Sequence, residues 1–457
     1  MGVMISRRAL LAAPAFLAPA RYNLLFLMSD QHQRRASSCY GHTQVRTPNI
    51  DRLANRGLRF ESAYCPSPVC VPSRGSLITG LHPHTHGAKI LDDALPSTSR
   101  TIAHYFAEKG YLTAAIGKMH FVDESRHHGF AHRLHEGDFT ASLTDAQRQQ
   151  VRDDHGDAGG INGSASELPI ELFQDHWFAE QSVKFLHQNK AKPFCLWASF
   201  LQPHTPFRPH RDYFDKYVPE QMTLPRRPIG DLENGFPGNL VRAKERGWAQ
   251  QSDDDARQSL AGYYGNVSQM DSYVGRVYDT LCELSLDKNT IVVYTSDHGE
   301  MAGAHRTWTK HNMYEESVGV PLVICIPDGP KGVRREIVEQ IDLFPTLTQL
   351  CGLGSVKLPG RSQKALIEGQ RHTPREFAYS EYYFCRKVFT KDDRYVGRPP
   401  LLMVRTAQYK LNYLSWDRCE LFDVQKDPGE FANLIDDPTL SGVVRELKLI
   451  AERQFRL

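Results

Sequence analysis

Short, nearly continuous runs of apolar residues are the strongest pattern along the chain. Five such runs occupy residues 22–28, 112–116, 194–201, 290–294 and 321–325. Runs of this length without polar alternation are typical of strands buried on both faces of a parallel sheet. Amphipathic stretches between them predict helices at residues 49–56, 101–109 and 259–284. This alternation predicts a doubly wound α/β domain with a large, mostly parallel sheet.

The pattern changes after about Pro359. Short segments typical of antiparallel strands occupy residues 377–383, 401–405, 409–413 and 420–424, and a closing helix begins at about Ser441. We therefore predict a large α/β domain over residues 21–360 and a smaller C-terminal α+β domain over residues 361–457. Two polar stretches, residues 136–168 and 226–258, are predicted to be loops over the ligand site. They either shape a substrate pocket or are neutral surface insertions.

Four of the five apolar runs are followed directly by chemically active side chains. These are Asp30 and Gln31 after the first run, Lys118 and His120 after the second, His204 after the third, and Asp297 and His298 after the fourth. In doubly wound sheets the ligand crevice lies beyond the carboxyl ends of the strands. The pattern therefore predicts an active site at this edge of the sheet.

Composition narrows the classes of function. The formal net charge is +2 over 457 residues, so we expect neither a nucleic acid nor a membrane as a partner. Nine cysteines without a C-x-x-C pair indicate neither a disulfide scaffold nor a structural zinc site. No segment after residue 20 is apolar enough to span a bilayer.

The first 20 residues have the pattern of a targeting segment. Arg7 and Arg8 precede an apolar stretch that ends in Ala18-Pro19-Ala20. This arrangement is similar to a twin-arginine export signal cut near Ala20, and the stretch is too short to span a bilayer. We therefore expect a periplasmic or secreted protein. The alternative is a basic tail on a cytoplasmic enzyme.

Residues 70–80 combine a nucleophile with groups that bind anions. Pro72 suits the first turn of a helix and Gly80 suits its end, so Cys70 is expected at a helix N-terminus. Free N–H groups and the helix dipole favour anions there. Arg74, one turn further along, can direct its guanidinium toward the same place and bind an oxyanion through two hydrogen bonds.

Two carboxylates at strand ends offer a metal site. Asp30 and Asp297 supply hard oxygen ligands, and Gln31 and His298 follow them directly. Because the carboxyl ends of these strands share one edge of the sheet, these four residues are predicted to hold one divalent cation.

Residues 70–80 resemble the modification signature of the formylglycine-dependent (type I) sulfatases, C-x-P-S-R-x-x-x-L-T-G, and differ from it at one fixed position, Ile78. The resemblance covers nearly the whole chain, including residues 28–31, 295–300, 308–311, 403–411 and 420–423. It implies an alkaline-phosphatase-like fold. It also implies that a formylglycine-generating enzyme oxidises Cys70 to formylglycine (3-oxoalanine) during maturation.

The resemblance assigns roles to the candidate residues. It implies Asp30, Gln31, oxidised Cys70, Asp297 and His298 as metal ligands, and Cys70, Arg74, Lys118, His120, His204 and Lys310 as the catalytic set. Ca²⁺ is the expected ion, with Mn²⁺ as the alternative because His298 brings an imidazole. Arg74, Lys118 and Lys310 give a positive charge suited to a sulfate ester. We expect His204 and Lys310 to protonate the leaving oxygen and His120 to act as the base that frees the sulfate.

We therefore predict a sulfatase that acts on a sulfated carbohydrate, with choline and aryl sulfates as alternatives. Gln31 and His298 depart from the commonest sulfatase metal set, which leaves open a phosphonate monoester or phosphodiester hydrolase with the same nucleophile. A phosphatase would carry Ser or Thr in place of Cys70, and a catalytically dead binding protein would lack a site residue, whereas none is missing. His305 and His311, which flank the Lys310 segment, either line the pocket or lie outside it.

Overall fold

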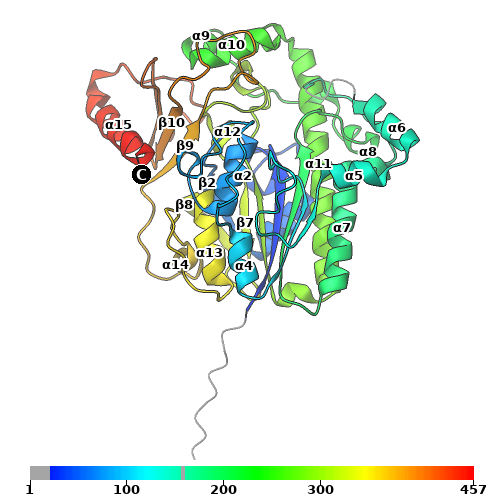
Figure 1. Cartoon of the computed structure of the whole chain (residues 1–457). Helices are drawn as coiled ribbons and strands as arrows, with labels where there is room; N and C mark the ends of the chain where they lie inside the picture. The colour runs from blue at the N-terminus through cyan, green and yellow to red at the C-terminus, as the bar shows by residue number, and fades with distance from the viewer. Residues whose placement is uncertain (1–20, 156–159, 457) are drawn as a thin grey trace, which may run out of the picture.

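The computed structural model describes residues 21–155 and 160–456, so the predicted export signal at residues 1–20 lies outside the described residues. Two sheets organise the described chain (Figure 1). The larger has eight strands in the order β4-β3-β5-β1-β6-β7-β2-β8, and the smaller has four in the order β12-β11-β10-β9. The predicted fold class, a large mostly parallel sheet with helices and a separate antiparallel sheet near the C-terminus, is confirmed.

The centre of the large sheet is parallel. Strand β1 (Asn23–Asp30) lies between β5 (Phe194–Pro203) and β6 (Thr290–Ser296), and β3 (Leu112–Gly117) pairs with the far side of β5. All these pairings are parallel. Four of the five predicted strands are therefore confirmed as neighbours, and their carboxyl ends meet at one edge.

The flanks of this sheet are less regular. The fifth predicted strand, β7 (Leu322–Cys325), pairs antiparallel with β6 and with β2 (Leu58–Tyr64), so its assignment to a parallel ladder was wrong. Strand β8 (Gly332–Glu339) pairs parallel with β2, and the short β4 (His132–Leu134) pairs parallel with β3. Strands β2, β4 and β8 escaped prediction because none of them is a continuous apolar run.

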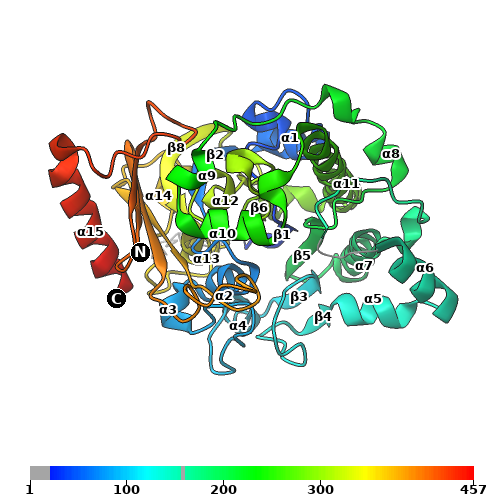
Figure 2. The ribbon, with the colours of Figure 1, turned by 90° about the horizontal axis from the view of Figure 1, so that it is seen from above.

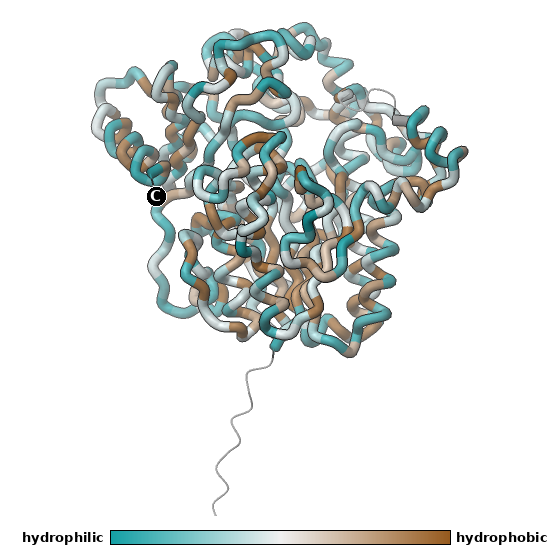
Figure 3. The backbone as a smooth tube through the Cα atoms, in the orientation of Figure 1, coloured by the Kyte–Doolittle hydropathy of each residue, from teal (hydrophilic) through white to brown (hydrophobic). Residues whose placement is uncertain are grey.

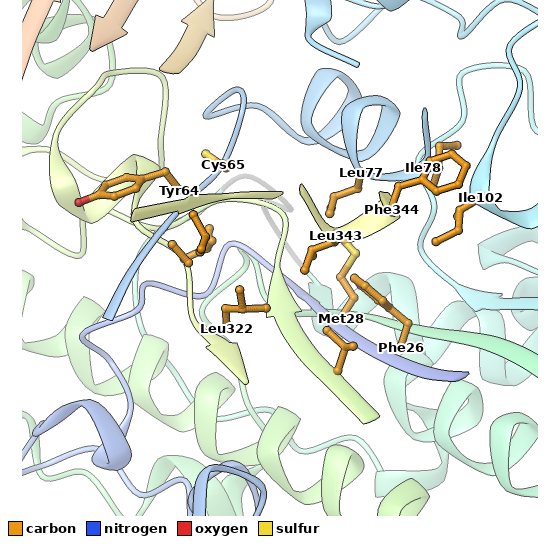
Figure 4. Close-up of a cluster of buried hydrophobic side chains, with 14 of the residues drawn as sticks. Phe26, Met28, Tyr64, Cys65, Leu77, Ile78, Ile102, Leu322, Leu343 and Phe344 are labelled. Carbon is orange, nitrogen blue, oxygen red and sulfur yellow. The ribbon is translucent and has the colours of Figure 1, made fainter. Parts of the chain in front are cut away.

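Helices cover both faces of the sheet. Side chains of β1 alternate between two cores: Leu24, Phe26 and Met28 belong to one, and Leu25 and Leu27 to the other. The second core is closed by α1 (Pro48–Arg56), α7 (Gln174–Asn189) and α11 (Asp253–Glu283). The first is closed by α2 (Cys70–Thr79), α4 (Ile102–Glu108) and α13 (Leu343–Leu350), whose Leu77, Ile78, Ile102, Leu343 and Phe344 pack together in Figure 4.

The small sheet forms a second layer beside the first. It consists of the antiparallel strands β9 (Phe377–Tyr382), β10 (Leu401–Thr406), β11 (Tyr409–Tyr413) and β12 (Glu420–Asp423). Helix α15 (Ser441–Phe455) covers one face with Leu447 and Ala451 (Figures 1 and 2). Between the two sheets, the fully buried Lys410 of β11 pairs with Glu315 and Glu430 at 3.4 and 2.7 Å. The domain boundary at residue 360 stays a prediction.

The two polar stretches are largely helical, so their prediction as loops was wrong. The first contains α5 (Glu136–Ser142) and α6 (Asp145–His155), and the second contains α9 (Asp231–Asn234) and α10 (Pro237–Glu245). Their sequences are rich in polar residues, which hides the helical period. Figure 3 shows that the apolar backbone segments gather in the middle of the molecule, while the outer helices are more hydrophilic.

Helices α9 and α10 lie beyond the upper end of the sheet in Figure 1, and in Figure 2, which views the molecule from above, they lie in front of it. The remaining helices are single turns: α3 (Pro83–His86), α8 (Arg211–Phe214), α12 (Glu315–Val318) and α14 (Lys364–Ile367). None of the described helices combines the length and the apolar character that crossing a membrane requires.

Helix α2 has the bounds that its sequence predicts. It begins at Cys70 and ends at Thr79, and the following Gly80 adopts the left-handed conformation with φ 69° and donates its N–H to the carbonyl of Ser76. A Cβ at Gly80 would lie 2.7 Å from Cδ1 of Leu358 and 3.4 Å from Cδ1 of Phe344. The position therefore requires glycine for both conformation and space.

Gly80→Ala is expected to lower the free energy of unfolding by about 2–4 kcal/mol, the sum of left-handed strain and the clash with Leu358. Urea unfolding followed by circular dichroism measures this loss. Gly41→Ala is the matched control, since Gly41 is also left-handed with φ 93° but has open space around its Cβ position. We expect the control to lose only the strain, about 1 kcal/mol. Equal losses in the two variants would contradict a packing constraint at Gly80.

Candidate active site

The predicted residues gather around one cavity at the carboxyl edge of β3, β5, β1 and β6. The cavity has a volume of about 660 Å³, and its lining includes Cys70, Lys118, His120, His204 and Lys310. Asp30, Gln31, Arg74, Asp297 and His298 are buried, at 2% exposure or less. The structure therefore brings together every residue that the sequence placed in the site, from strands β1, β3, β5 and β6, helix α2 and the loop before α12.

Four buried side chains at the base of this cavity form a compact donor cluster. One ligand atom from each of Asp30, Cys70, Asp297 and His298 lies within 4.8 Å of the others. Sγ of Cys70 is 3.1 Å from Nε2 of His298 and 3.8 Å from Oδ1 of Asp30. Nε2 of His298 lies 3.7 Å from Oδ1 of Asp297 and 3.9 Å from Oδ1 of Asp30. Two carboxylates and an imidazole at this spacing fit a divalent cation.

Arg74 holds the two carboxylates from the side opposite to the cluster centre. Its Nη2 lies 3.0 Å from Oδ2 of Asp30, and its Nε lies 2.8 Å from Oδ2 of Asp297. Its Nη1 donates to Oγ of Ser199 at 2.9 Å and to the carbonyl of Lys118. The guanidinium thus connects helix α2 to strands β1 and β5, to the residue that follows β3 and to the loop after β6. These partners are protein groups, and contact of Arg74 with a substrate oxyanion stays a prediction.

Lys118 is a second cation that pairs with the carboxylate of Asp30. Its Nζ lies 2.9 Å from Oδ2 of Asp30. Burial by itself would raise the pKa of Asp30, but Lys118, His204 and Arg74 hold this pKa well below its usual range. Asp30 is therefore an anion in the folded protein, as a metal ligand must be.

The Cys70 thiol experiences opposing influences. Burial and the Asp30 carboxylate raise its pKa, whereas Lys310, His298 and Lys118 lower it, and the net pKa is well below that of a free thiol. The α2 N-terminus adds its dipole in the same direction. Positive charge therefore outweighs negative charge at the position of the predicted nucleophile.

Gln31 adopts a left-handed conformation with φ 67°, and its backbone carbonyl accepts a hydrogen bond from the Tyr263 hydroxyl at 3.1 Å. Its backbone N–H donates to Oδ1 of Asp297 at 3.0 Å, its side-chain amide donates to the buried Glu300, and its Oε1 accepts from Nζ of Lys310. Gln31 therefore connects Lys310 to the carboxylates, and its role as a metal ligand stays a prediction. Glu300 was not among the predicted site residues, although it follows Asp297 by three positions.

Two histidines of the predicted set differ in their environment. Nδ1 of His204 lies 2.8 Å from the carbonyl of Thr205, which can only accept, so this nitrogen carries the proton and Nε2 is free. Burial, and then Lys310 and Lys118, lower the pKa of His204 to about 3. His120 has φ 55°, and its buried Nδ1 has no hydrogen-bond partner among the described residues. Left-handed non-glycine residues such as His120 cluster at functional sites.

The sequence left open whether His305 and His311 line the pocket, and the structure gives a different answer for each. His311 lines the cavity and has φ 83°. His305 instead pairs with Oδ2 of Asp231 at 3.0 Å and stacks on Tyr314 with ring centroids 4.0 Å apart. His305 is absent from the cavity lining.

The segment predicted as the second loop supplies one wall of the cavity. Arg242 of α10, Arg246, Trp248 and Gln251 line it. No motif marks these residues, because they belong to a polar stretch without apolar periodicity. The sequence therefore located the reacting end of the cavity and missed the wall that faces the rest of a substrate.

Comparison with known proteins agrees with this geometry. A sequence profile described as Sulfatase matches residues 22–353, and one described as N-sulphoglucosamine sulphohydrolase, C-terminal, matches residues 303–454. Choline-sulfatase of Rhizobium meliloti is 29% identical over 455 residues, which covers 95% of this chain and 86% of the relative. Arylsulfatase of Clostridium perfringens is 30% identical over 456 residues, with 91% and 90% covered.

Among solved structures, the phosphonate monoester hydrolase of Agrobacterium radiobacter superposes with a TM-score of 0.82 at 24% identity, covering 95% of this chain and 96% of that one. This likeness concerns the fold. The Sulfatase profile spans most of the chain and the carboxyl edge of the sheet with its Cys70 helix. The chain therefore belongs to the sulfatase family and is a sulfuric ester hydrolase.

Proposed function

We propose that this sulfatase hydrolyses a sulfate ester of a carbohydrate, using a formylglycine made from Cys70 and one divalent cation. The observation that carries the proposal is the position of Cys70. It begins α2 within the modification signature, and its Sγ lies 3.1 and 3.8 Å from His298 and Asp30 at the base of the cavity. The proposed nucleophile thus lies beside a buried cluster of possible metal ligands and several cationic side chains.

Formylglycine suits sulfate transfer because its hydrate has two hydroxyls on one carbon, so that one can attack sulfur and the other can lose its proton to expel sulfate. Maturation replaces the sulfur of Cys70 by oxygen and removes two hydrogens, which requires an external oxidising enzyme. We propose a formylglycine-generating enzyme as that partner. The signature around Pro72 and Arg74 supports this proposal.

The donor set proposed for the cation is Asp30, Asp297, His298 and the oxidised residue 70, with Gln31 beside them. When bound, the cation withdraws electron density from the oxygens that it contacts. Two carboxylates favour Ca²⁺, and the imidazole of His298 keeps Mn²⁺ as the alternative. Arg74 and Lys118 fix the carboxylates through their Oδ2 atoms, which leaves Oδ1 of each directed at the cluster.

Proton transfer is proposed for the residues that line the cavity. His204 has no hydrogen-bond partner at Nε2 among the described residues, and Lys310 lies close enough to Cys70 to lower the pKa of its thiol. The cations that lower the pKa of His204 would be compensated by a bound sulfate, so substrate binding favours the imidazolium that can protonate the leaving oxygen. His120, from the β3 end next to Lys118, is the proposed base for release of sulfate.

The cavity supports a saccharide better than choline. Its volume of about 660 Å³ suits a sugar-sized ligand, and most of its lining is polar. A quaternary ammonium ion binds best inside a cage of aromatic rings. Of the described residues that line this cavity, Trp248 is the one Phe, Tyr or Trp, and five are Lys or Arg against one acidic residue, Asp255. The cavity would therefore repel a cationic alcohol. We also propose export to the periplasm or beyond, on the basis of Arg7 and Arg8.

Cys70→Ala is expected to abolish hydrolysis of sulfate esters while the fold is retained, because the nucleophile is removed and His298, which loses its Sγ partner at Nε2, keeps the hydrogen bond between Nδ1 and the carbonyl of Gly299. The chain is co-expressed with a maturation enzyme, and peptide mass spectrometry measures conversion of Cys70 to formylglycine. Turnover is then measured on a panel of sulfate esters, phosphodiesters and phosphonate monoesters. We expect sulfate esters to be the preferred substrates by at least about tenfold in kcat/KM.

Cys65→Ala is the matched control, since Cys65 is equally buried but lies in the apolar core outside the signature. It should keep both modification and turnover. Full activity of Cys70→Ala would contradict the nucleophile, and preference for phosphonate esters would favour the rival activity.

Chelation is expected to remove activity reversibly, and Asp30→Asn or Asp297→Asn to weaken metal binding by at least about tenfold. Each aspartate supplies one of the two formal negative charges assigned to the cation, so losing either leaves the cation under-neutralised. Elemental analysis of the purified protein and titration of the chelated enzyme with Ca²⁺ or Mn²⁺ measure the effect. Asp271→Asn is the control, since this carboxylate is buried but binds backbone N–H groups of Asn49 and Ile50. A site variant that kept its metal and rate would refute the ligand assignment.

His204→Ala is expected to lose about a hundredfold or more in kcat on an alkyl sulfate and less than about tenfold on nitrophenyl sulfate. An alkoxide must be protonated as the S–O bond breaks, whereas nitrophenolate leaves without help. His120→Ala should instead trap a sulfated enzyme with either substrate, which intact mass spectrometry detects. His187→Ala, in an exposed position on α7, is the control. Equal losses on both substrates for His204→Ala, with no adduct in His120→Ala, would overturn these two roles.

A further inference from the structure

Arg242 on α10 is a buried cation that forms no ion pair with any residue that the structure describes. Its side chain lines the active-site cavity, and the residue is 3% exposed. Its Nη2 donates to Oγ1 of Thr309 at 3.0 Å, and its guanidinium lies over Trp248 at 5.4 Å from the ring centroid. Nη1 has no hydrogen-bond partner, and within residues 21–155 and 160–456 no carboxylate lies within ion-pair distance of this guanidinium.

Burial of this guanidinium without a counter-ion costs free energy. Arginine is almost never fully buried in proteins unless it is paired, because burial removes its hydration without replacing it. Burial lowers the pKa of Arg242 to about 10 and Arg246 acts in the same direction, whereas Tyr382, Glu300 and Glu245 act in the opposite direction. Its neighbour across the cavity wall is similar, because Nδ1 of His311 is also buried without a partner among the described residues. Arg242 and His311 both line the same cavity, so an anion bound there is the kind of partner that these two nitrogens lack.

The cationic side chains near Cys70 already have partners within the protein. Arg74 and Lys118 pair with Asp30, and Lys310 donates to Gln31. Arg242 instead approaches from α10, and its hydrogen bond to Thr309 ties it to the residue next to Lys310. The cavity therefore has cations at two places: a set at the reacting end and a separate, unpaired one on the α10 wall. Arg246 and Lys387 add further positive charge to its lining.

We propose that the α10 wall binds a second anionic group of the substrate, so that the preferred substrate is a sulfate ester that also carries a carboxylate or a second sulfate. This inference rests on the proposed function and specifies its substrate class. Arg242 offers the free N–H groups of Nη1 and one remaining on Nη2, which suit the two oxygens of either anion. Trp248 gives the guanidinium an apolar backing that fixes its plane.

The test uses matched pairs of sulfated monosaccharides. One pair compares a sulfated hexuronate with its carboxamide, and the other compares N,O-disulfated glucosamine with its N-acetyl counterpart. The matured enzyme is expected to favour the member with the second anion by at least about tenfold in kcat/KM in one pair, since a hydrogen-bonded charge pair contributes that much. A preference in the first pair indicates that the second anion is a carboxylate, and a preference in the second pair indicates that it is a sulfate.

Arg242→Gln should reduce this preference to less than about threefold, mainly through KM. Arg242→Lys keeps the charge and should retain part of it. Lys244→Gln is the matched control, because Lys244 is an exposed cation on the same helix outside the cavity lining, and its preference should equal that of the wild type. Thermal melting checks that each variant is folded.

Calorimetric binding of the same pairs to the Cys70→Ala protein gives a readout that is independent of turnover. If the wild type hydrolyses sulfate esters but neither pair shows a preference in rate or in binding, the second-anion inference is overturned and the proposed function stands. A preference that survives in Arg242→Gln likewise overturns the inference. If no sulfate ester is hydrolysed, the proposed function fails, while the calorimetric preference still decides the anion site. The wild-type comparison decides the question even if Arg242→Gln does not fold.

Discussion

The site depends on one buried ionic contact, in which the guanidinium of Arg74 bridges the carboxylates of Asp30 and Asp297. Both carboxylates are fully buried at the ends of adjacent strands, 2.8 and 3.0 Å from the guanidinium. Two like charges at this depth would repel each other and lose their hydration unless a cation stood between them. Because Arg74 belongs to α2, the same contact docks the helix that begins with Cys70. Cys70, the proposed nucleophile, is therefore held beside the two carboxylates by this contact, together with the hydrogen bond from Oγ of Ser73 to the carbonyl of Asp297.

Local patterns in the sequence predicted the parts of the molecule that depend on local chemistry. The strands that lie at the centre of the sheet are buried on both faces and therefore appear as continuous apolar runs. Helix α2 has its bounds because Pro72 and Gly80 mark its ends. Strand β2 was missed because Arg59 and Glu61 alternate with apolar residues, so that it lacks such a run. The helices at residues 136–155 and 231–245 were missed because polar side chains hide their period.

The ion-pair partners of the charged groups could not be predicted from local patterns, because these partners are far apart in the chain. Arg74 was expected to face an oxyanion, whereas its carboxylate partners lie 44 and 223 positions away in the chain. Arg242 carried no signal at all, since an arginine in a polar stretch is usually solvated. Its proposed role arises from burial beside Trp248 with no carboxylate of the described chain within ion-pair distance, which is a property of the folded state. A near-neutral total charge likewise concealed a cavity lined by five cationic residues and one acidic residue.

The buried Lys410 between the two sheets has a consequence for how such an enzyme can change during evolution. Lys410 comes from the small sheet, whereas its partner Glu315 directly follows the loop that carries Lys310 and His311. Glu315 also binds Arg34, four residues after Asp30. A shared charge network thus joins the small sheet to two segments of the candidate active site, so a change on one side of the network alters the ion pairs of the other. Recombination between relatives that replaced one side of this network would remove the ion pair between Lys410 and Glu315 and leave Lys410 with Glu430, and Glu315 with Arg34, as remaining partners.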